Sequence, residues 1–467
     1  MEKFESLFAQ TRPAFEQERV FQRARKLAVS TIVGLGKRTI SGMLCAGAEH
    51  FQDWTAAYRV FSSERIDKQA LFAPARKAAV ECLNDNEPLT VIYDDTIVRK
   101  RGRKIHGTGW KRDPLGPQFC NNFIWGQRFL QMSAALPDVD CPGRARGIPI
   151  DFIHAPSPAK PKKKDHPDLW QQYRKLQNQC RVTAVAAESL RQLRQQVEEE
   201  RKIICAVDGG FTNQTFFRDV PHNTVLVGRI RKDARLFAPP KETDKPQRGR
   251  KRWYGQPLPT PEEVRQDESV AWKQVEAYAS GKCHQFEVKQ MPAVRWKGSG
   301  DKTVQIVIIR PLAYRPRKGS HLLYRNPVYL LCTDQTMPLE TILQSYIWRW
   351  EIELNFRDEK TVMGAGQAQV RTAASVESVP QLVVAAYAYL LLAGTAAKYD
   401  ALPRPKWQKS RPGERTTTQM MQNVFRAQLW KVVIDGNKTY FVNRPPQKQT
   451  PFYSHNTLNY AACYAFK

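Results

Sequence analysis

Two short apolar runs that each end on aspartate constrain the fold of this chain more than any other feature. Leu89–Tyr93 reads Leu-Thr-Val-Ile-Tyr and continues into Asp94 and Asp95, and Ile203–Val207 continues into Asp208 and two glycines. Runs of this length that are rich in β-branched and aromatic residues are typical of buried strands. Carboxylates at the ends of two core strands could meet in space and share one chemical task.

The segments between these runs follow the order of an RNase-H-like α/β core. Further strands are expected at Asn122–Trp125 and Arg128–Ala135, separated by Gly126. A basic loop rich in proline and glycine at Pro137–Pro161 is expected next, and then one long helix at Asp168–Glu200. Three strands, a helix and a fourth strand, with carboxylates after the first and fourth strands, is the order of that core.

The remaining segments are expected to surround or interrupt this core. Apolar residues at three- and four-residue spacing predict helices at 15–30, 55–61 and 68–83. A basic, proline-rich stretch with strand-like runs follows residue 236, and helical character resumes at Pro338. We therefore expect an N-terminal helical DNA-binding domain at 1–86, the RNase-H-like core at 87–235 and 336–400, a β-rich basic insertion domain at 236–335, and a mainly helical C-terminal region at 401–467 that could serve dimerisation.

The net charge of +28 is far larger than solubility requires, and such an excess attracts polyanions, with nucleic acid as the leading candidate. No run reaches the roughly 18 to 20 consecutive apolar residues that span a bilayer, so no membrane partner is expected. The longest candidate, Leu382–Ala397, contains two tyrosines and a glycine and is expected to be a buried helix. Met1–Arg19 lacks the basic and apolar parts of a secretory signal, which predicts a cytoplasmic protein. The cysteines include no C-x-x-C pair, which argues against structural zinc.

The densest group of chemically active side chains lies near residue 350. Four of them recur at helical spacing: Tyr346, Arg349, Glu353 and Lys360. At 100° per residue they fall within about 60° of one another, so a continuous helix would present them as one polar stripe. A solvated ion pair between Arg349 and Glu353 is one explanation, but it leaves the phenol and the lysine without a role. A carboxylate that holds a metal ion, beside cations that hold phosphate oxygens, accounts for all four.

This spacing resembles the Y-(2)-R-(3)-E-(6)-K signature of the DDE transposases of the insertion-sequence-four superfamily. Other family segments occur in the family's order: Ala56–Phe61, Asp95-Thr96, Asp208-Gly209, Arg229–Asp233 and Gly364–Gly366. Three segments look most like the insertion-sequence-seven-hundred-and-one branch: Asp94–Thr96, Arg112–Leu115 and Gly126–Phe129. The resemblance extends over about residues 55 to 366.

By this resemblance, Asp95, Asp208 and Glu353 form the catalytic triad and bind two Mg²⁺ ions, for which Mn²⁺ can substitute. The resemblance implies cut-and-paste transposition, in which phosphodiester hydrolysis is followed by strand transfer from a 3′-hydroxyl. It also implies double-stranded DNA partners, both terminal inverted repeats and target DNA, and a homodimer working on the bacterial nucleoid. Asp208 alone could be a turn residue before its two glycines, but its place among the other motifs favours catalysis.

Three neighbouring carboxylates compete with members of this triad. Asp94 and Asp95 are adjacent on a strand, so their side chains point to opposite faces and only one of them can be the ligand. The alignment with the family favours Asp95. Glu351 and Glu359 compete with Glu353, but neither of them lies on the polar stripe.

The DNA-binding surface is expected to combine the stripe residues Tyr346, Arg349 and Lys360 with basic clusters at 99–104 and 248–252. Either cluster could also be a solvated loop. Family members often form a DNA hairpin in which a flipped base stacks on an aromatic residue of the insertion domain. Tyr329 aligns with that aromatic, where the family has tryptophan. Trp296 is the alternative stacker, although an isolated aromatic is more often part of a core.

Two other functions fit the same residues. One is an RNase-H-fold nuclease that hydrolyses DNA without strand transfer, because fold alone does not define the reaction. The other is a domesticated DNA-binding protein without catalysis. The complete signature favours transposition over both.

Overall fold

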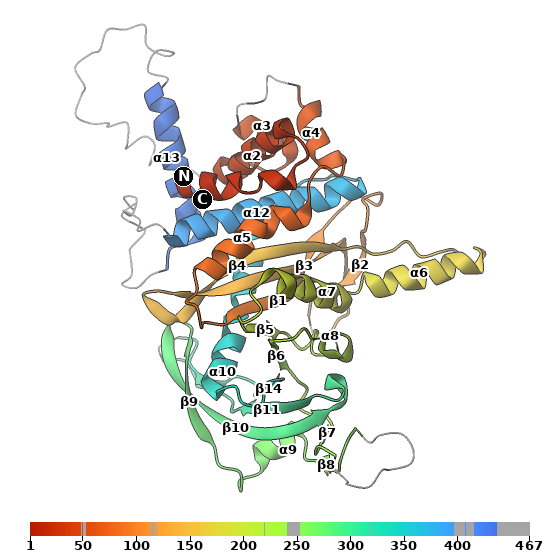
Figure 1. Cartoon of the computed structure of the whole chain (residues 1–467), viewed down its shortest axis with the longest axis vertical. Coiled ribbons are helices and arrows are strands. Elements are labelled where there is room, and N and C mark those ends of the chain that lie inside the picture. Colours follow the sequence, from red (N-terminus) through yellow and green to blue (C-terminus); the bar gives the residue numbers. More distant parts are fainter. Residues whose placement is uncertain are drawn as a thin grey trace.

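A twelve-stranded mixed sheet runs through the computed structural model, and helices pack on both of its faces (Figure 1). The structure describes residues 1–47, 49, 53–113, 116, 117, 119–218, 220–240, 253–317, 319–396, 407 and 415–436. The predicted basic cluster at 248–252 and most of the predicted C-terminal region lie outside these residues.

The strands are β1 Leu89–Arg99, β2 Gly109–Arg112, β3 Phe123–Asp138, β4 Cys141–Ala155, β5 Ile203–Val207, β6 Thr224–Arg229, β7 Leu236–Phe237, β8 Pro257–Leu258, β9 Lys273–Ala279, β10 Lys282–Trp296, β11 Thr303–Ile309, β12 Ala313–Tyr314, β13 Leu323–Tyr324 and β14 Val328–Cys332. The helices are α1 Glu2–Ala9, α2 Glu18–Val33, α3 Ile40–Ala46, α4 Thr55–Ser62, α5 Lys68–Glu81, α6 Pro167–Gln179, α7 Val182–Gln196, α8 Gln214–Arg218, α9 Pro261–Gln266, α10 Leu339–Trp348, α11 Glu351–Thr361, α12 Ala373–Ala396 and α13 Thr418–Gly436, with short 3₁₀ turns at Arg12–Ala14 and Lys297–Ser299.

The centre of the sheet is parallel. β1 pairs in parallel with β5, and β5 pairs in parallel with β6. β3 lies antiparallel on the other side of β1 and carries β4 and β2. This mixed sheet with helices on both faces is consistent with the predicted RNase-H-like core.

The predicted insertion is built as a continuation of the same sheet. β14 pairs antiparallel with β6, and β11 and β10 follow in the strand order. The parallel centre and the strands of the insertion therefore share one hydrogen-bonded sheet, which places the insertion directly beside β6 and the end of β5.

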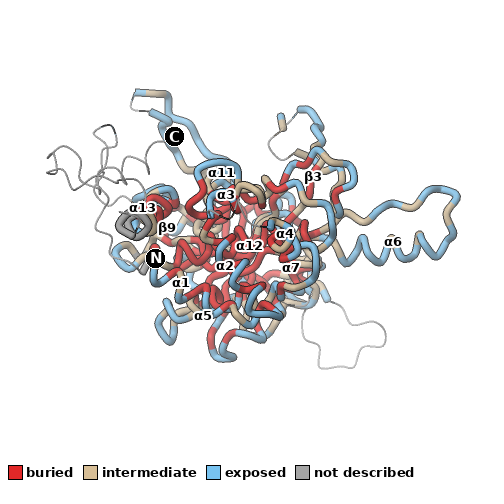
Figure 2. Tube along the Cα trace, turned by 90° about the horizontal axis from the view of Figure 1, so that it is seen from above, coloured by how far each residue is buried: buried red, intermediate tan, exposed pale blue. Residues whose placement is uncertain are grey.

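The N-terminal helices pack on α12 and share its core. α12 contacts α1, α2, α4 and α5, and one hydrophobic cluster extends from Phe4 to Phe425. The tube coloured by burial shows this continuous buried centre (Figure 2). Residues 1–86 therefore bury their apolar faces against the helix that follows α11.

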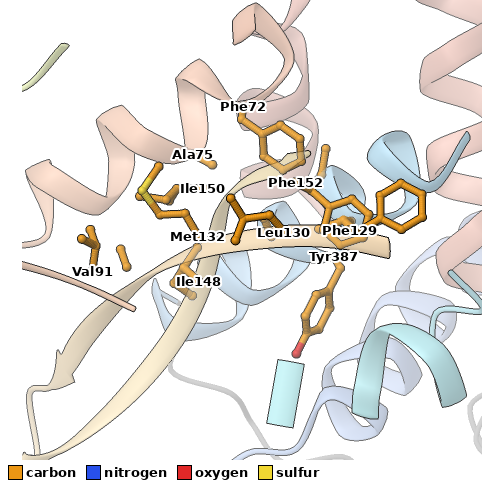
Figure 3. Packing of buried hydrophobic residues seen from close by; sticks show 14 of the residues in the cluster. Phe72, Ala75, Val91, Phe129, Leu130, Met132, Ile148, Ile150, Phe152 and Tyr387 are labelled. Atoms are coloured by element: carbon orange, nitrogen blue, oxygen red, sulfur yellow. The ribbon is translucent and has the colours of Figure 1, made fainter. Parts of the chain in front are cut away.

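Aromatic side chains fill the space between β3, β4, α5 and α12 (Figure 3). The Phe129 and Phe152 rings stack with their centroids 4.8 Å apart, and Phe72 and Tyr387 lie beside them from the two helices. All four side chains are buried. This core holds β3 and β4 against the helices.

Two predictions about strands were wrong. The predicted strands on either side of Gly126 are one strand, β3, and a Cβ at Gly126 would lie 2.6 Å from the Val98 carbonyl oxygen. The glycine therefore marks a close approach of two strands, not a break between them. The predicted loop at 137–161 is mostly β4, because Ile148, Ile150 and Phe152 are buried when it pairs with β3. Pairing between distant segments overrides the turn preference of proline and glycine here.

The predicted long helix at 168–200 is two helices, α6 and α7, which meet at Cys180 and Arg181. Neither a proline nor a glycine marks this junction in the sequence. α7 packs on the sheet, whereas α6 has no buried residue. The break lets the second helix stay in the core while the first projects away from it.

α12 is the one helix among the described residues that is long and apolar enough, by length and composition, to cross a membrane. Most of its apolar window is buried inside the protein. Its sequence is therefore explained by its place at the centre of the fold, as predicted for the buried helix near residue 390.

Candidate active site

The two aspartates of β1 face opposite sides of the sheet. Ile92 packs with Ile352 and Phe356 of α11, which shows that the even-numbered positions of β1 face that helix. The hydroxyl of Tyr93 donates to the Ser189 Oγ of α7 at 3.4 Å, on the opposite side. Asp94 therefore lies on the α11 side of the sheet, and Asp95 lies on the α7 side.

Asp94 is held beside the glutamate of the signature. Its Oδ2 accepts a hydrogen bond from Arg349 Nη1 at 3.2 Å. Burial raises the pKa of Asp94 to about 7 against the opposing effect of Arg349, and the nearby Glu353 and Asp95 carboxylates raise it further. Asp94 and Glu353 are therefore close enough to repel each other when both are ionised.

Asp95 faces a different set of charges. Its carboxylate pairs with Arg128 Nε at 3.1 Å, and Lys111 lies nearby. Burial raises the pKa of Asp95, the two cations lower it, and Asp208 adds a small rise. The structure thus places Asp95 beside Asp208 but on the opposite side of β1 from Glu353.

Asp208 follows β5 at the level of the β1 aspartates. Tyr93 is paired with Val207 in the parallel register, so the next residues, Asp94 and Asp208, lie at the same level on adjacent strands. The Thr212 hydroxyl donates to the Asp208 carbonyl at 3.2 Å and closes the turn that follows. The prediction that the strand ends before its aspartates was wrong for β1, because β1 continues to Arg99 and both of its aspartates lie within the strand.

The signature segment was predicted to be one continuous helix, and this prediction was wrong. The segment forms two helices, α10 and α11, which are joined at Arg349 and Trp350. The backbone bonds from Arg349 to Tyr346 and from Glu353 to Trp350 span three residues, which is the tighter 3₁₀ pattern. The tightened turn leaves Trp350 largely exposed and buries Ile352 against the sheet. The rotation of 100° per residue that predicted one polar stripe therefore does not hold across this turn.

The stripe residues nevertheless remain near one another. The Arg349 guanidinium lies 5.7 Å from the centroid of the Tyr346 ring. Burial lowers the pKa of Lys360, and the Glu359 and Glu353 carboxylates oppose this effect. The Nε of Arg349 is buried and has no hydrogen-bond partner among the residues that the structure describes. The guanidinium thus keeps a donor that an incoming phosphate oxygen could accept.

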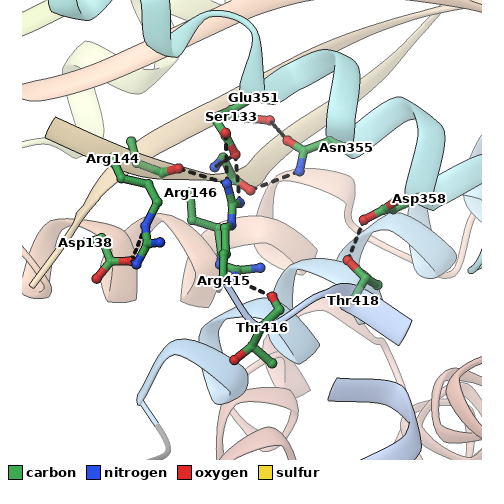
Figure 4. A network of polar contacts seen from close by, with 12 residues as sticks. Ser133, Asp138, Arg144, Arg146, Glu351, Asn355, Asp358, Arg415, Thr416 and Thr418 are labelled. Atoms are coloured by element: carbon green, nitrogen blue, oxygen red, sulfur yellow. Dashed lines mark hydrogen bonds and ion pairs between the residues drawn. The ribbon is translucent and has the colours of Figure 1, made fainter. Parts of the chain in front are cut away.

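The competing glutamates of α11 have other partners. Glu351 Oε2 pairs with Arg415 Nη2 at 2.7 Å, within the polar network that joins α11 to the segment before α13 (Figure 4). Glu359 is 1% exposed, and Gln131 donates a hydrogen bond to it. Glu353 is exposed, so of these three carboxylates it is the one open to a ligand.

A cleft of about 1060 Å³ opens beside Asp208 toward the insertion strands. Its charged and aromatic lining comprises Asp208, Arg229, Arg231, Lys232, Asp233, Glu262, Arg265, Trp296 and Tyr329. Arg231 is paired with Asp233 and Arg265 with Glu262, so Arg229 and Lys232 are the cations of this lining that form no ion pair within the described part of the chain.

The two predicted base-stacking residues form part of the wall of this cleft. Tyr329 is 4% exposed and donates its hydroxyl to the carboxylate of Glu262, and burial followed by this bond raises the pKa of Tyr329 to about 12. Trp296 is partly buried and meets Phe217 edge-on at 5.9 Å. Tyr329 is thus held in the wall, while part of Trp296 stays accessible.

The donor chemistry at Asp94, Asp208 and Glu353 suits a hard divalent cation, because all three offer carboxylate oxygens. Among the described residues, however, no three acidic, histidine or cysteine side chains lie close enough to hold one ion. The structure brings Asp94 and Glu353 together on one side of β1, with Asp208 on the neighbouring strand, without closing the three carboxylates around an ion.

The sequence did not reveal the charged residues that pair with the candidate site residues Asp95 and Tyr329. Lys111 and Glu262 are ordinary charged residues in the sequence, and the Gly126–Phe129 segment that contains Arg128 does not indicate that Arg128 pairs with Asp95. The alternation of side chains along β1 was the one available signal for Asp94. It could not be used alone, because the face that receives α11 depends on tertiary packing.

One comparison with known proteins identifies the family of this chain. A family model described as "DDE superfamily endonuclease" matches residues 18–302, which is more than half of the chain. The match includes both β1 aspartates and Asp208 and ends before Glu353. No curated protein matches the chain.

Proposed function

Since the chain belongs to the DDE superfamily endonuclease family, we propose that it is a DNA transposase that excises an insertion sequence and joins it to target DNA. The family is one of nucleases and transposases that act on DNA and generally use divalent metal ions such as Mg²⁺. The observation that carries the proposal is that Glu353 lies near Asp94 while Arg349 donates a hydrogen bond to Asp94. Asp208 follows the neighbouring strand, β5.

Asp94 is the first carboxylate of the proposed active site, in place of the Asp95 that the family alignment favours. Asp94 shares the α11 side of β1 with Glu353, and its carboxylate is held by Arg349 of the signature. Asp95 is already paired with Arg128 on the far side. Asp95 remains the second candidate because it lies near Asp208.

Asp94, Asp208 and Glu353 would hold the divalent ions, with Mg²⁺ expected and Mn²⁺ able to replace it. When bound, such ions activate the attacking oxygen and stabilise the leaving oxygen of an in-line displacement. Arg349 would bind a nonbridging phosphate oxygen through its Nε, which has no hydrogen-bond partner among the described residues, and Lys360 would bind the next phosphate. Tyr346 keeps the Arg349 guanidinium in place through its ring face.

The DNA end would lie in the cleft between Asp208 and the insertion strands. The phosphate backbone of the DNA would be contacted there by Arg229, Arg231 and Lys232. A hairpin intermediate needs an aromatic side chain that is free to stack on a flipped base. Trp296 meets this need better than Tyr329, whose hydroxyl is engaged by Glu262.

The test uses duplexes made from the genomic DNA on either side of this gene, incubated with the purified protein and Mg²⁺. We expect cleavage at the end of a paired inverted repeat and joining of the labelled 3′ end to a target plasmid. Asp94→Asn, Asp208→Asn and Glu353→Gln should each lower the cleavage rate at least about 100-fold while keeping DNA affinity, because these residues serve chemistry and the cations serve binding.

Asp95→Asn is the matched control for Asp94→Asn, because both changes remove one charge from adjacent positions of β1. Cleavage that survives Asp94→Asn and is lost in Asp95→Asn would reverse the assignment. Nicking without any joined product would favour the nuclease that acts without strand transfer. Full cutting in excess EDTA would exclude the metal-dependent mechanism.

Synapsis of two ends implies a dimer on DNA. We propose a homodimer that forms when terminal repeats are bound. Light scattering of the protein with and without end DNA checks this, and a complex with one protein chain on paired ends would contradict it.

A further inference from the structure

The predicted basic cluster at 99–104 contains cations with very different surroundings. Arg99 pairs with Asp113 at 2.7 Å, and the buried Lys100 donates two hydrogen bonds to backbone carbonyls of the loop after α11. Both of these cations therefore have partners within the protein. Arg103 is exposed, and its guanidinium forms neither a hydrogen bond nor an ion pair within the described part of the chain.

Two indole rings hold the Arg103 guanidinium in place. Its Cζ lies 5.2 Å from the centroid of the Trp110 ring and 4.9 Å from that of the Trp125 ring. The two rings meet edge-on with their centroids 5.6 Å apart, and Trp110 is 56% exposed. A cation over an aromatic face is attracted by the ring without using its N–H donors. Arg103 is therefore fixed at the surface while its donors stay free for an external acceptor.

The loop that carries Arg103 is anchored on both sides of this residue. Trp125 Nε1 donates to the Gly102 carbonyl at 3.1 Å, and Gln127 Nε2 donates to the His106 carbonyl at 3.0 Å. The His106 N–H donates to a backbone carbonyl just before α12 at 3.1 Å. The alternative of a freely solvated loop does not fit these bonds. Little ordering is left to be done when a ligand binds, which favours affinity.

The Arg103 site lies on the same face of the sheet as Asp94. Ser133 of β3 donates to a side chain of α11 at 3.0 Å, so the odd-numbered positions of β3 face that helix. Trp125 is one of these positions, and Trp110 is its partner in the pairing of β2 with β3. Paired residues of adjacent strands point to the same face, so both indoles share the face of the candidate active site.

The candidate active site lies between this surface and the cleft beside Asp208. β2 is the last strand at one end of the sheet, and the insertion strands lie at the other end (Figure 1). Arg112, two positions beyond Trp110 on β2, points to the same face as Trp110 and is exposed. No partner of its guanidinium is found among the described residues. DNA bound across the candidate site would therefore meet cations on both sides.

The separation of Arg103 from Asp94 is given by the strands. The Lys100 N–H donates to the Trp125 carbonyl at 3.0 Å, so the indoles lie at the level of Lys100. Lys100 follows Asp94 by six residues, which is about 20 Å at roughly 3.3 Å per residue. A DNA strand advances about 3.4 Å per nucleotide along the duplex axis, so this separation corresponds to about six base pairs. A duplex that lies along β1 would reach both sites.

We propose that Arg103, fixed by Trp110 and Trp125, binds a backbone phosphate of duplex DNA, and that Arg112 binds a neighbouring phosphate. The two indoles are positioning residues that act through Arg103. The identification of this duplex as the DNA end held at the candidate active site rests on the proposed function. Phosphate binding is a property of this surface and does not depend on cleavage.

The test is fluorescence anisotropy of the full chain with a labelled duplex of unrelated sequence, about 20 base pairs long, which exceeds the distance from Asp94 to Arg103. EDTA is present, so that cleavage plays no part. Arg103→Gln and Arg112→Gln should each make the slope of log affinity against log salt shallower by about 0.9, the value for one phosphate of a duplex. An unchanged slope for Arg103→Gln overturns the proposal.

The positioning role of the indoles is tested separately. Trp110→Ala should weaken duplex binding by up to about fivefold, the upper end for an exposed charge pair, because Arg103 loses its fixed geometry. Trp110→Phe should restore most of the affinity, since a ring remains under the cation. In the Arg103→Gln background, Trp110→Ala should cause no further loss. Additive losses would show that the indole contacts DNA directly and would overturn the positioning role.

Arg191→Gln is the matched control, because it also removes one exposed arginine. Arg191 lies on α7, on the opposite face of the sheet, where it pairs with Glu188 at 2.6 Å. Its salt slope should equal that of the unaltered protein. An equal change of slope in Arg191→Gln and Arg103→Gln would show that net charge alone is responsible, and this result would overturn the proposal.

Hydroxyl-radical footprinting of end DNA separates this inference from the proposed function. Arg103→Gln should lose protection about six base pairs from the cleavage point and keep protection at that point. If end DNA is never cleaved but the salt slope changes in Arg103→Gln, the phosphate site stands and the transposase assignment falls. If cleavage occurs and the slope does not change, the phosphate site falls and the transposase assignment stands.

Discussion

The buried carboxyl of Glu359 provides a quantitative test of the packing beneath α11. Its pKa is raised from 4.5 to about 8, mainly by burial, and its Oε1 has no hydrogen-bond partner among the described residues. At neutral pH the folded protein therefore holds this side chain as a neutral acid, whereas the unfolded chain holds it ionised. Glu359→Gln replaces the neutral acid with a neutral amide of nearly the same shape.

The sign of the effect follows from proton linkage. Folding takes up a proton at Glu359 between pH 4.5 and about 8, so its stabilising contribution is fully present below this window and is lost as pH rises through it. Each pH unit changes the free energy of unfolding by about 1.4 kcal/mol. Between pH 5 and pH 7 the unaltered protein should therefore lose about 3 kcal/mol relative to Glu359→Gln.

Urea unfolding followed by tryptophan fluorescence at pH 5 and pH 7 measures this difference for both proteins. Glu340→Gln, at an exposed position of α10, is the matched control and should follow the unaltered protein at both pH values. If the unfolding free energies of Glu359→Gln and the unaltered protein change in parallel between the two pH values, the burial argument is refuted. Glu359 would then be ionised in the folded state.

Three further predictions address the core, a backbone turn and DNA binding. Phe129→Ala should destabilise the protein by about 3 to 5 kcal/mol, because it leaves a cavity beside the stacked Phe152, and its urea midpoint reports the loss. Gly366→Ala should cost roughly 1 to 3 kcal/mol in the same assay, because the residue has φ +89° and a Cβ would lie 2.2 Å from Val98 Cγ1. An unchanged urea midpoint would contradict the cavity argument for Phe129→Ala or the steric argument for Gly366→Ala. Lys360→Ala should keep its melting temperature and make the salt slope of end-DNA binding shallower by about 0.9 if the lysine holds a phosphate. Lower stability with an unchanged slope would identify Lys360 as a structural partner of Glu353.

The strands and the helix that carry the candidate site residues were largely readable from local sequence. The apolar runs before Asp94 and Asp208 are strand residues, and they lie side by side because β1 and β5 pair in parallel, although β1 continues beyond its aspartates to Arg99. The helical segment with Glu353 packs against the same sheet. These features depend on strand and helix patterns within about 15 residues, and such patterns act before any tertiary contact forms.

The N-terminal helices and the buried helix near residue 390 were also predicted from apolar spacing. The packing of these helices into one shared core was not predicted, because the sequence does not show which apolar faces contact one another. The same limit applies to β4, which local composition predicted as a loop. Its pairing with β3 buries Ile148, Ile150 and Phe152 together, and that gain exists only when the distant strand is present.

The sequence by itself determined that one of two adjacent aspartates reaches an edge shared with Asp208, but only the tertiary structure decided which face each occupies. Asp94 and Asp95 are chemically identical, and alternation along a strand separates them without saying which side is which. The packing of Ile352 on Ile92 settles that Asp94 faces α11. The turn at Arg349 and the burial of Tyr329 were likewise decided by tertiary packing, because the positions of side chains in space depend on neighbours far away in the chain.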